Sequence, residues 1–125
     1  MNTLAPAPTT ADLLRSARSL IAKPGNWTKG SFYELREHPD GATLTGYCTV
    51  GAIDEAAFLA RALRGLQAGN TDFTRLKAQL AVALVVGVDV RALPAWNDEP
   101  ERTHAEVLAA FDKAIEIETQ REAQP

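Results

Sequence analysis

Hydrophobic positions recur with a helical period in four separate parts of the chain. In the last of these, the apolar residues fall within one arc of about 120° when successive residues turn by about 100°. A capping box formed by Thr103 and Glu106 marks the helix start at His104. We therefore predict a helix that ends near Thr119 and buries one face, with His104 projecting into the middle of it. The apolar residues of that face are Val107, Leu108, Phe111, Ala114 and Ile115.

Three further helices are predicted upstream from the same periodicity. The first runs from about residue 10 to 22, with Thr9 as its cap. The second spans residues 49 to 66 with Thr49 as its cap, and Gly51 within it indicates that another backbone crosses nearby. The third follows residues 69–72, and we favour a helical end over a strand for its valine-rich residues 84–90. The predicted buried faces are Val50, Ile53, Leu59 and Leu63 in the second helix, and Phe73, Leu76, Leu80 and Leu84 in the third.

Between residues 26 and 47 the helical period disappears, and turn-forming residues separate short runs rich in aromatic residues and threonine. The turn signal Pro39-Asp40-Gly41 predicts a small β-hairpin. Because a two-stranded hairpin is marginal by itself, we expect it to lie over the helices, anchored by Trp27 and Phe32. Alternation along the strand then places Tyr33 on the opposite, exposed face.

The predicted fold class is mainly α, a four-helix single domain with a small β-hairpin between helices 1 and 2. At 125 residues the chain is long enough for one hydrophobic core and shorter than chains that divide into domains. We predict a single helical domain over residues 10–119, flanked by disordered tails at 1–9 and 120–125. The longest apolar run, residues 80–88, is much shorter than the about 20 residues of a membrane-spanning helix. The first residues lack the features of a signal peptide, so we expect a cytoplasmic protein with no membrane interaction.

The net charge of −3 is unevenly distributed along the chain. Residues 1–36 carry five Lys or Arg against two Asp or Glu, whereas residues 97–125 carry three against eight. The basic surplus is small for a nucleic-acid-binding protein, so we predict no nucleic-acid partner. We expect the basic N-terminal and acidic C-terminal segments to lie side by side.

Cys48, His104 and Asp98 are the residues from which a catalytic site could be built. A thiolate nucleophile needs an imidazole to take its proton, and the imidazole needs an oxygen to fix its tautomer, a role open to Asp98 or Asn97. Cys48 also precedes a helix N-terminus, which would lower the pKa of its thiol. The structural alternative is a buried Cys48 that fills a small apolar gap and a His104 that bonds residues 96–98 and closes the core.

No pattern in the sequence indicates a metal or a cofactor. A single cysteine excludes a thiolate-rich zinc site, and His38, His104, Cys48 and Asp98 would have to converge from distant segments. Neither glycine-rich phosphate-binding motif is present. We therefore predict no cofactor and no metal, although Asn97 and Asp98 beside Trp96 could bind a small polar ligand.

Two motifs give the chain a wider resemblance. The first is Cys-x-x-Gly-Ala at residues 48–52, and the second is Trp-Asn-Asp-x-Pro-x-x-Thr-His at residues 96–104. Together with residues 13–22 and 27–32, they resemble a family of short proteins of unknown function from bacteria and their phages, over residues 10–118. The resemblance implies that the two motifs belong together. It implies no activity, and its phage connection favours a small effector or inhibitor that binds a host protein.

We therefore predict a small, soluble, non-catalytic binding or regulatory protein, of which a phage-type effector or inhibitor acting on a host protein is one form. The alternative is a Cys-His dependent hydrolase or transferase that uses Cys48 and His104. A protein partner should contact aromatic residues outside the helical stripes, which occur in the hairpin and in residues 96–102. The predicted partner-binding residues are Tyr33, Trp27, Trp96 and Asn97. The sequence names neither the protein partner nor the oligomeric state.

Overall fold

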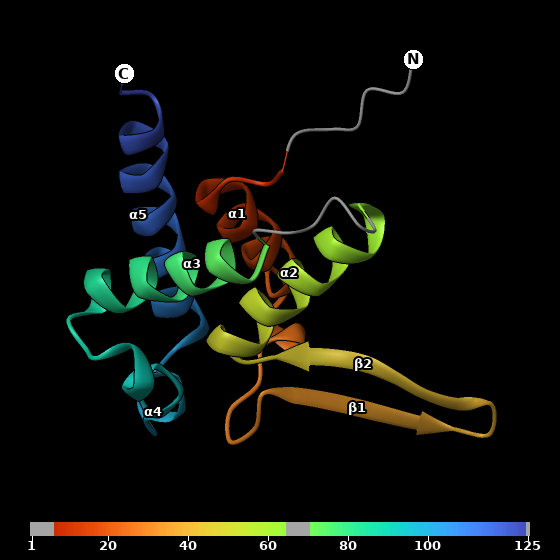
Figure 1. Ribbon diagram of the computed structural model, residues 1–125. Coiled ribbons are helices and arrows are strands. Elements are labelled where there is room, and N and C mark those ends of the chain that lie inside the picture. Colours follow the sequence, from red (N-terminus) through yellow and green to blue (C-terminus); the bar gives the residue numbers. More distant parts are fainter. Residues whose placement is uncertain (1–6, 65–70, 125) are drawn as a thin grey trace, which may run out of the picture.

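The computed structural model describes residues 7–64 and 71–124. Within these ranges the chain forms five α-helices and one β-hairpin (Figure 1). The mainly α class and the place of the hairpin between the first two helices are confirmed. The elements are α1 (Thr10–Leu20), β1 (Tyr33–His38), β2 (Gly41–Tyr47), α2 (Thr49–Arg64), α3 (Thr71–Val86), α4 (Leu93–Asp98) and α5 (His104–Glu122), with short 3-10 turns at Pro24–Asn26 and Val90–Ala92.

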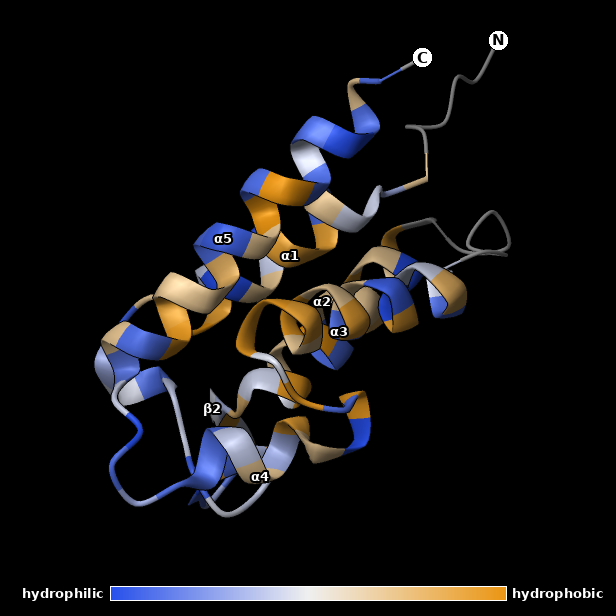
Figure 2. Cartoon of the chain, turned by 90° about the vertical axis from the view of Figure 1, so that its left-hand side faces the viewer, coloured by the Kyte–Doolittle hydropathy of each residue, from blue (hydrophilic) through white to orange (hydrophobic). Residues whose placement is uncertain are grey.

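Helix α1 lies at the centre of the helical packing. It packs against α2, α3 and α5, and α3 also packs against α2 and α5. As a result, α2 and α5 pack mainly on α1 and α3 rather than on each other, and Figure 2 shows α1 beside α5 and α2 beside α3. In the described ranges no single helix is long and apolar enough to cross a bilayer. The largest fully buried apolar side chains are Leu13, Leu14, Ile21, Ile53, Val82, Leu93, Val107 and Phe111.

Polar contacts join the basic helix α1 to the acidic helix α5. Arg18 forms an ion pair with Asp112, and the Arg15 guanidinium donates a hydrogen bond to the Thr119 hydroxyl at 2.8 Å. The Ala11 amide, in the first turn of α1, donates to the Glu122 carboxylate at 3.1 Å. The expectation that the two oppositely charged segments lie side by side is confirmed. Helix α5 continues past the predicted end at Thr119, and the contact of Glu122 with the positive end of α1 favours this extension.

The predicted number of four helices is wrong, because residues between the third and last predicted helices form the short helix α4. Pro94 lies in the first turn of α4, where a residue without an amide hydrogen loses no hydrogen bond. The Asp89 carboxylate accepts a hydrogen bond from the Arg91 amide at 2.8 Å and starts the preceding 3-10 turn. Pro94 therefore begins a helix rather than preventing one.

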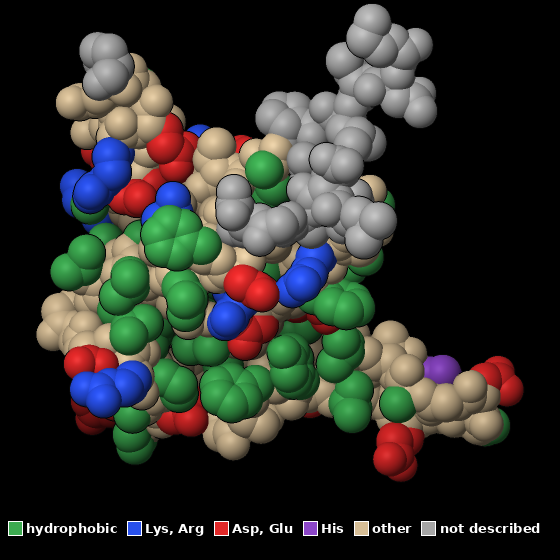
Figure 3. Space-filling model, viewed as in Figure 1, with side chains coloured by type: hydrophobic (Ala, Val, Ile, Leu, Met, Phe, Trp, Pro, Cys, Tyr) green, Lys and Arg blue, Asp and Glu red, His purple; other side chains and the backbone are tan. Residues whose placement is uncertain are grey.

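The buried face of α3 is not the predicted stripe. Phe73, Leu76, Leu80 and Leu84 are 46 to 76% exposed, and Figure 3 shows hydrophobic side chains gathered on this side of the molecule. Leu59 and Leu63 of α2, also predicted to be buried, are exposed. Small side chains on the packed face allow close approach of the neighbouring helices, which leaves the larger residues outside. The buried residues of α3 are Thr71, Thr74, Ala78, Gln79, Ala81, Val82 and Ala83. The helix itself continues to Val86, as favoured from the sequence, and ends before Gly87, whose φ is +78°.

The hairpin projects from the helical body instead of lying over it (Figure 1). Its predicted turn is confirmed, because His38 pairs with Gly41 across Pro39 and Asp40. All of β1 is exposed, and Phe32, predicted as an anchor, is 48% exposed. The expected position over the helices is therefore wrong. The hairpin is attached at its base, where the Thr28 amide donates to the Tyr47 carbonyl at 3.0 Å.

Gly51 allows the chain to cross α2 at the base of the hairpin. A Cβ atom at this position would lie 2.1 Å from the Phe32 carbonyl oxygen. That same oxygen accepts a hydrogen bond from the Cys48 amide at 3.0 Å. The backbone crossing predicted from Gly51 is confirmed, and it fixes the start of the hairpin against the first turn of α2.

Candidate functional site

Asn97 is the centre of a buried hydrogen-bond network. Its Oδ1 accepts from the Trp27 indole at 2.8 Å, the Thr49 amide at 3.0 Å and the Thr49 hydroxyl at 2.7 Å. Its Nδ2 donates to the Thr28 carbonyl at 3.0 Å and to the Asp98 carboxylate at 2.9 Å. Because this fully buried side chain is saturated with partners, it joins α4 to the start of α2 and to the segment that precedes the hairpin.

The residues that follow Asn97 bind the segment before the hairpin through hydrogen bonds at the protein surface. The Asp98 carboxylate accepts from the Gly30 amide at 2.9 Å. The Lys29 ammonium donates to the carbonyls of Glu99 and Pro100, at 2.8 and 3.2 Å. The Asn-Asp part of the second sequence motif therefore fixes residues 27–30.

Cys48, and not Thr49, caps the N-terminus of α2. The Cys48 sulfur accepts a hydrogen bond from the Gly51 amide at 3.3 Å, and its carbonyl accepts from the Ala52 amide at 2.9 Å. The side chain is 2% exposed. Burial raises the pKa of the Cys48 thiol and outweighs the bonds from the Gly51 and Val50 amides, which lower it. A catalytic thiol requires the opposite shift.

His104 contacts α1 rather than the residues expected from the sequence. Its Nε2 lies 2.6 Å from the Ile21 carbonyl oxygen, and its ring lies on Trp27, with 5.9 Å between the ring centroids. A carbonyl can only accept, so this nitrogen carries the proton. In residues 7–64 and 71–124 no hydrogen bond joins His104 to Cys48 or to Asp98, so the proton relay that the catalytic hypothesis requires is not formed. The bond to residues 96–98 in the structural alternative is not formed either.

Metal ligands do not converge in the part of the chain that the structure describes. No group of three or more His, Cys, Asp or Glu side chains there could hold an ion. His38 lies at the end of β1, where its Nε2 is 2.7 Å from the Thr43 hydroxyl.

Of the four residues predicted to bind a partner, only Tyr33 lies on the open surface. Asn97 and Trp96 are buried, and the Arg102 guanidinium covers the Trp96 ring at 4.2 Å from its centroid. Trp27 is half-buried, and its indole nitrogen is bonded to Asn97. These three residues therefore hold elements together rather than present a contact surface.

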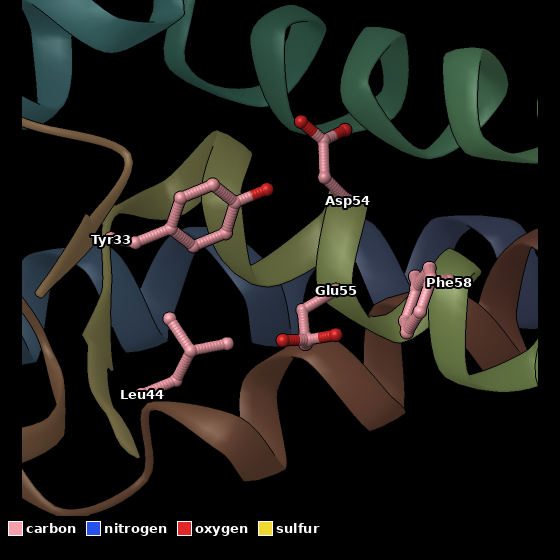
Figure 4. A pocket seen from close by; sticks show the side chains of 5 residues that line it. All are labelled: Tyr33, Leu44, Asp54, Glu55 and Phe58. Atoms are coloured by element: carbon pink, nitrogen blue, oxygen red, sulfur yellow. The ribbon is translucent and has the colours of Figure 1, made fainter. Parts of the chain in front are cut away.

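Tyr33 lines a groove between the hairpin and α2, which we call the hairpin groove. Tyr33 and Leu44 come from the hairpin, and Asp54, Glu55 and Phe58 come from α2 (Figure 4). The hollow has a volume of about 260 Å³. Its hairpin wall belongs to an apolar face, because Tyr33 pairs with Tyr47 and Leu35 pairs with Leu44 across the two strands. Residues directly opposite each other share one face of a sheet.

The two carboxylates of the hairpin groove have different partners. Asp54 accepts from the Arg75 guanidinium at 3.2 Å and from the Gln79 amide at 2.8 Å. Glu55 accepts from the Tyr47 hydroxyl at 3.3 Å and forms no ion pair within the described residues. Partial burial raises the pKa of Tyr33, and the charges of Asp54 and Glu55 raise it further. The groove therefore combines apolar walls with negative charge.

Sequence reasoning placed Phe58 under the hairpin but missed the two carboxylates of this groove. Phe58 lies off the main apolar face of its helix, and it follows the adjacent acidic residues Asp54 and Glu55 by one turn. An exposed aromatic residue beside carboxylates on a helix is a signal for a contact surface, but the hairpin wall opposite it depends on tertiary packing.

The family profile of a group of proteins without known function matches the chain. No curated protein sequence and no solved structure matches the chain. The family match extends over residues 5–117 and so includes both sequence motifs and every residue of the hairpin groove. The chain belongs to the family of unknown function DUF6197.

Proposed function

We propose that this protein is a non-catalytic binding protein that holds a protein partner against the hairpin groove. The observation that carries the proposal is the uncovered apolar face of the hairpin, where Leu35 is 58% exposed and Tyr33 and Leu44 are also exposed. Two-stranded hairpins are marginal without further packing, and exposed apolar strands favour association with other chains. A partner that lies across this face would bury it.

The small size of the domain favours a regulatory role, in which the protein acts by binding to a partner and covering part of its surface. The resemblance to short bacterial and phage proteins favours a phage-type effector or inhibitor that occupies a surface of a host protein. In such a protein the Asn97 network has an indirect part, because it fixes the segment from which the hairpin starts. The hairpin can then be presented in one orientation.

The geometry offers the alternative of Cys-His catalysis no support. The Cys48 sulfur is buried and bonded to the Gly51 amide. His104 is bonded to α1 through Ile21. A substrate would have to displace core residues to reach the thiol, whereas the hairpin groove is already open to solvent.

Site-specific photo-crosslinking in bacterial extract tests the proposal. A photoreactive phenylalanine analogue replaces Leu35 on the apolar face of the hairpin, and a matched variant carries it at Gln120, an exposed position on α5. We expect a discrete adduct from position 35 and none from position 120. Addition of Tyr33→Ala should suppress the adduct while the free energy of unfolding changes by no more than about 0.5 kcal/mol, as for an ordinary surface substitution. Equal adducts at both positions would contradict the proposal, and so would an adduct that survives Tyr33→Ala.

A further inference from the structure

We infer that the hairpin groove binds an arginine side chain presented by an apolar segment of the partner protein. This inference rests on the proposed function and adds the chemistry by which the partner is recognised. Three features of the groove support it: its aromatic walls, an acidic residue without a cationic partner, and the commitment of the neighbouring cations to other residues.

The walls of the groove suit a long side chain with an apolar stem and a flat cationic end. Tyr33 approaches from the hairpin and Phe58 from α2, and Leu44 lies below Tyr33 (Figure 4). The Tyr33 ring makes an edge-to-face contact with the Tyr47 ring, with 6.0 Å between the ring centroids. Aromatic faces attract cations, and a guanidinium also stacks on them. An arginine stem can cover the apolar wall while its head reaches polar atoms.

Glu55 supplies the charge that an arginine requires. Its only hydrogen bond among the described residues comes from the neutral Tyr47 hydroxyl, so its negative charge has no counterpart in this part of the chain. Burial raises the pKa of Tyr47, and the Glu55 carboxylate raises it further. A carboxylate accepts two parallel bonds from a guanidinium, so an incoming arginine would balance the charge of Glu55 and leave its bond to Tyr47 in place.

Among the described residues, two arginines near the groove pair with carboxylates other than Glu55. Arg75 pairs with Asp54 at 3.2 Å, and Arg61 pairs with Asp72 at 3.1 Å. Both ion pairs line a second hollow that shares Asp54 and Phe58 with the hairpin groove and extends toward α3. An arginine from the partner would therefore meet Glu55 without competition from within the described chain, and the apolar residues beside it would meet Leu35 and Phe58.

Selection of peptides from a random displayed library on the full-length protein provides the probe. We expect enriched peptides to contain an arginine flanked by apolar residues. In a solution binding assay, replacement of that arginine by glutamine should weaken binding by about tenfold or more, and replacement by lysine should weaken it less. Enrichment of peptides without a basic residue, or no enrichment at all, would overturn the inference.

Matched variants of the protein assign the effect to one carboxylate. Glu55→Gln keeps an oxygen that can accept from the Tyr47 hydroxyl, so its thermal unfolding should match the wild type. It should nevertheless lose about tenfold in peptide affinity. Glu101→Gln removes the same charge from an exposed loop residue and should change nothing. Glu55→Lys should bind the peptide whose arginine is replaced by glutamate.

The outcomes separate this inference from the proposed function. Equal affinities for Glu55→Gln and Glu101→Gln, with crosslinking at position 35 intact, would refute arginine recognition and leave the binding function standing. Loss of crosslinking at position 35 would refute the binding function itself.

Discussion

At the start of α2, the side chains of Cys48 and Asn97 satisfy backbone amides that have no acceptor within the helix. The Cys48 sulfur accepts from Gly51, and the Asn97 oxygen accepts from Thr49. The first four amides of any helix lack such partners. The cysteine motif and the Trp-Asn-Asp motif therefore meet at one helix N-terminus, and a structural reason is enough to pair them.

Alkylation of Cys48 distinguishes this capping role from a catalytic one. Because Cys48 is buried and the pKa of its thiol is raised, the thiolate fraction near neutral pH is lower than for a free cysteine. We expect iodoacetamide to modify the native protein slowly at about pH 6 to 8 and the urea-unfolded protein fast, as followed by mass spectrometry. The His104→Ala variant should label no more slowly than the wild type. Fast native labelling that His104→Ala abolishes would establish the catalytic alternative.

At the level of elements, the helix ends could be predicted where the signal is local. Thr103 and Glu106 form the predicted capping box, in which the Glu106 amide donates to the Thr103 hydroxyl at 3.2 Å and the Thr103 amide donates to the Glu106 carboxylate at 2.9 Å. A cap depends only on residues within one turn. The two-residue turn of the hairpin could be predicted for the same reason.

The buried face of α3 could not be predicted, because its sequence contains two helical stripes. One consists of large residues such as Leu80 and Leu84, and the other of small residues around Val82. Both have helical spacing, and only the neighbouring helices decide which one packs. The groove shows the same division: Tyr33 is exposed as predicted, but so is Phe32, whose burial the prediction assumed, and Glu55 joins Tyr33 only through the docking of the hairpin base on α2.

Asn97 joins several elements, whereas Thr103 caps a single helix, so we compare how much the substitution of each lowers the free energy of unfolding. Thr103→Ala should destabilise the protein by about 1 kcal/mol, since it removes one exposed cap. Asn97→Ala leaves the Trp27 indole and the Thr49 amide without their buried acceptor, at about 1 to 3 kcal/mol for each such group. We expect urea denaturation to give a loss at least about twice that of Thr103→Ala. Equal losses would mean that water replaces Asn97 in the network.

At the scale of the whole molecule, large hydrophobic side chains are divided between one core and one open side. The core is filled by leucines and isoleucines of α1, α2 and α4 together with Val82 and Phe111. The open side carries the large residues of α3, the exposed end of α2 and the hairpin (Figure 3). Between the hairpin groove and the large residues of α3, the ion pairs Arg75–Asp54 and Arg61–Asp72 line a second hollow, so a partner on this side would meet apolar and charged surface together.

Two leucine substitutions test this division. Leu93 is fully buried at the start of α4, whereas Leu84 on α3 is 76% exposed. Leu93→Ala removes the same atoms as Leu84→Ala but leaves a cavity, so it should cost about 2 to 5 kcal/mol. Leu84→Ala should change the free energy of unfolding by no more than about 0.5 kcal/mol, because the Leu84 side chain stays largely in contact with water when the protein folds. The midpoints and slopes of urea unfolding curves measure both values. A large loss for Leu84→Ala, with an unchanged slope and at a protein concentration low enough to exclude association, would mean that the stripe of large residues on α3 packs inside the fold.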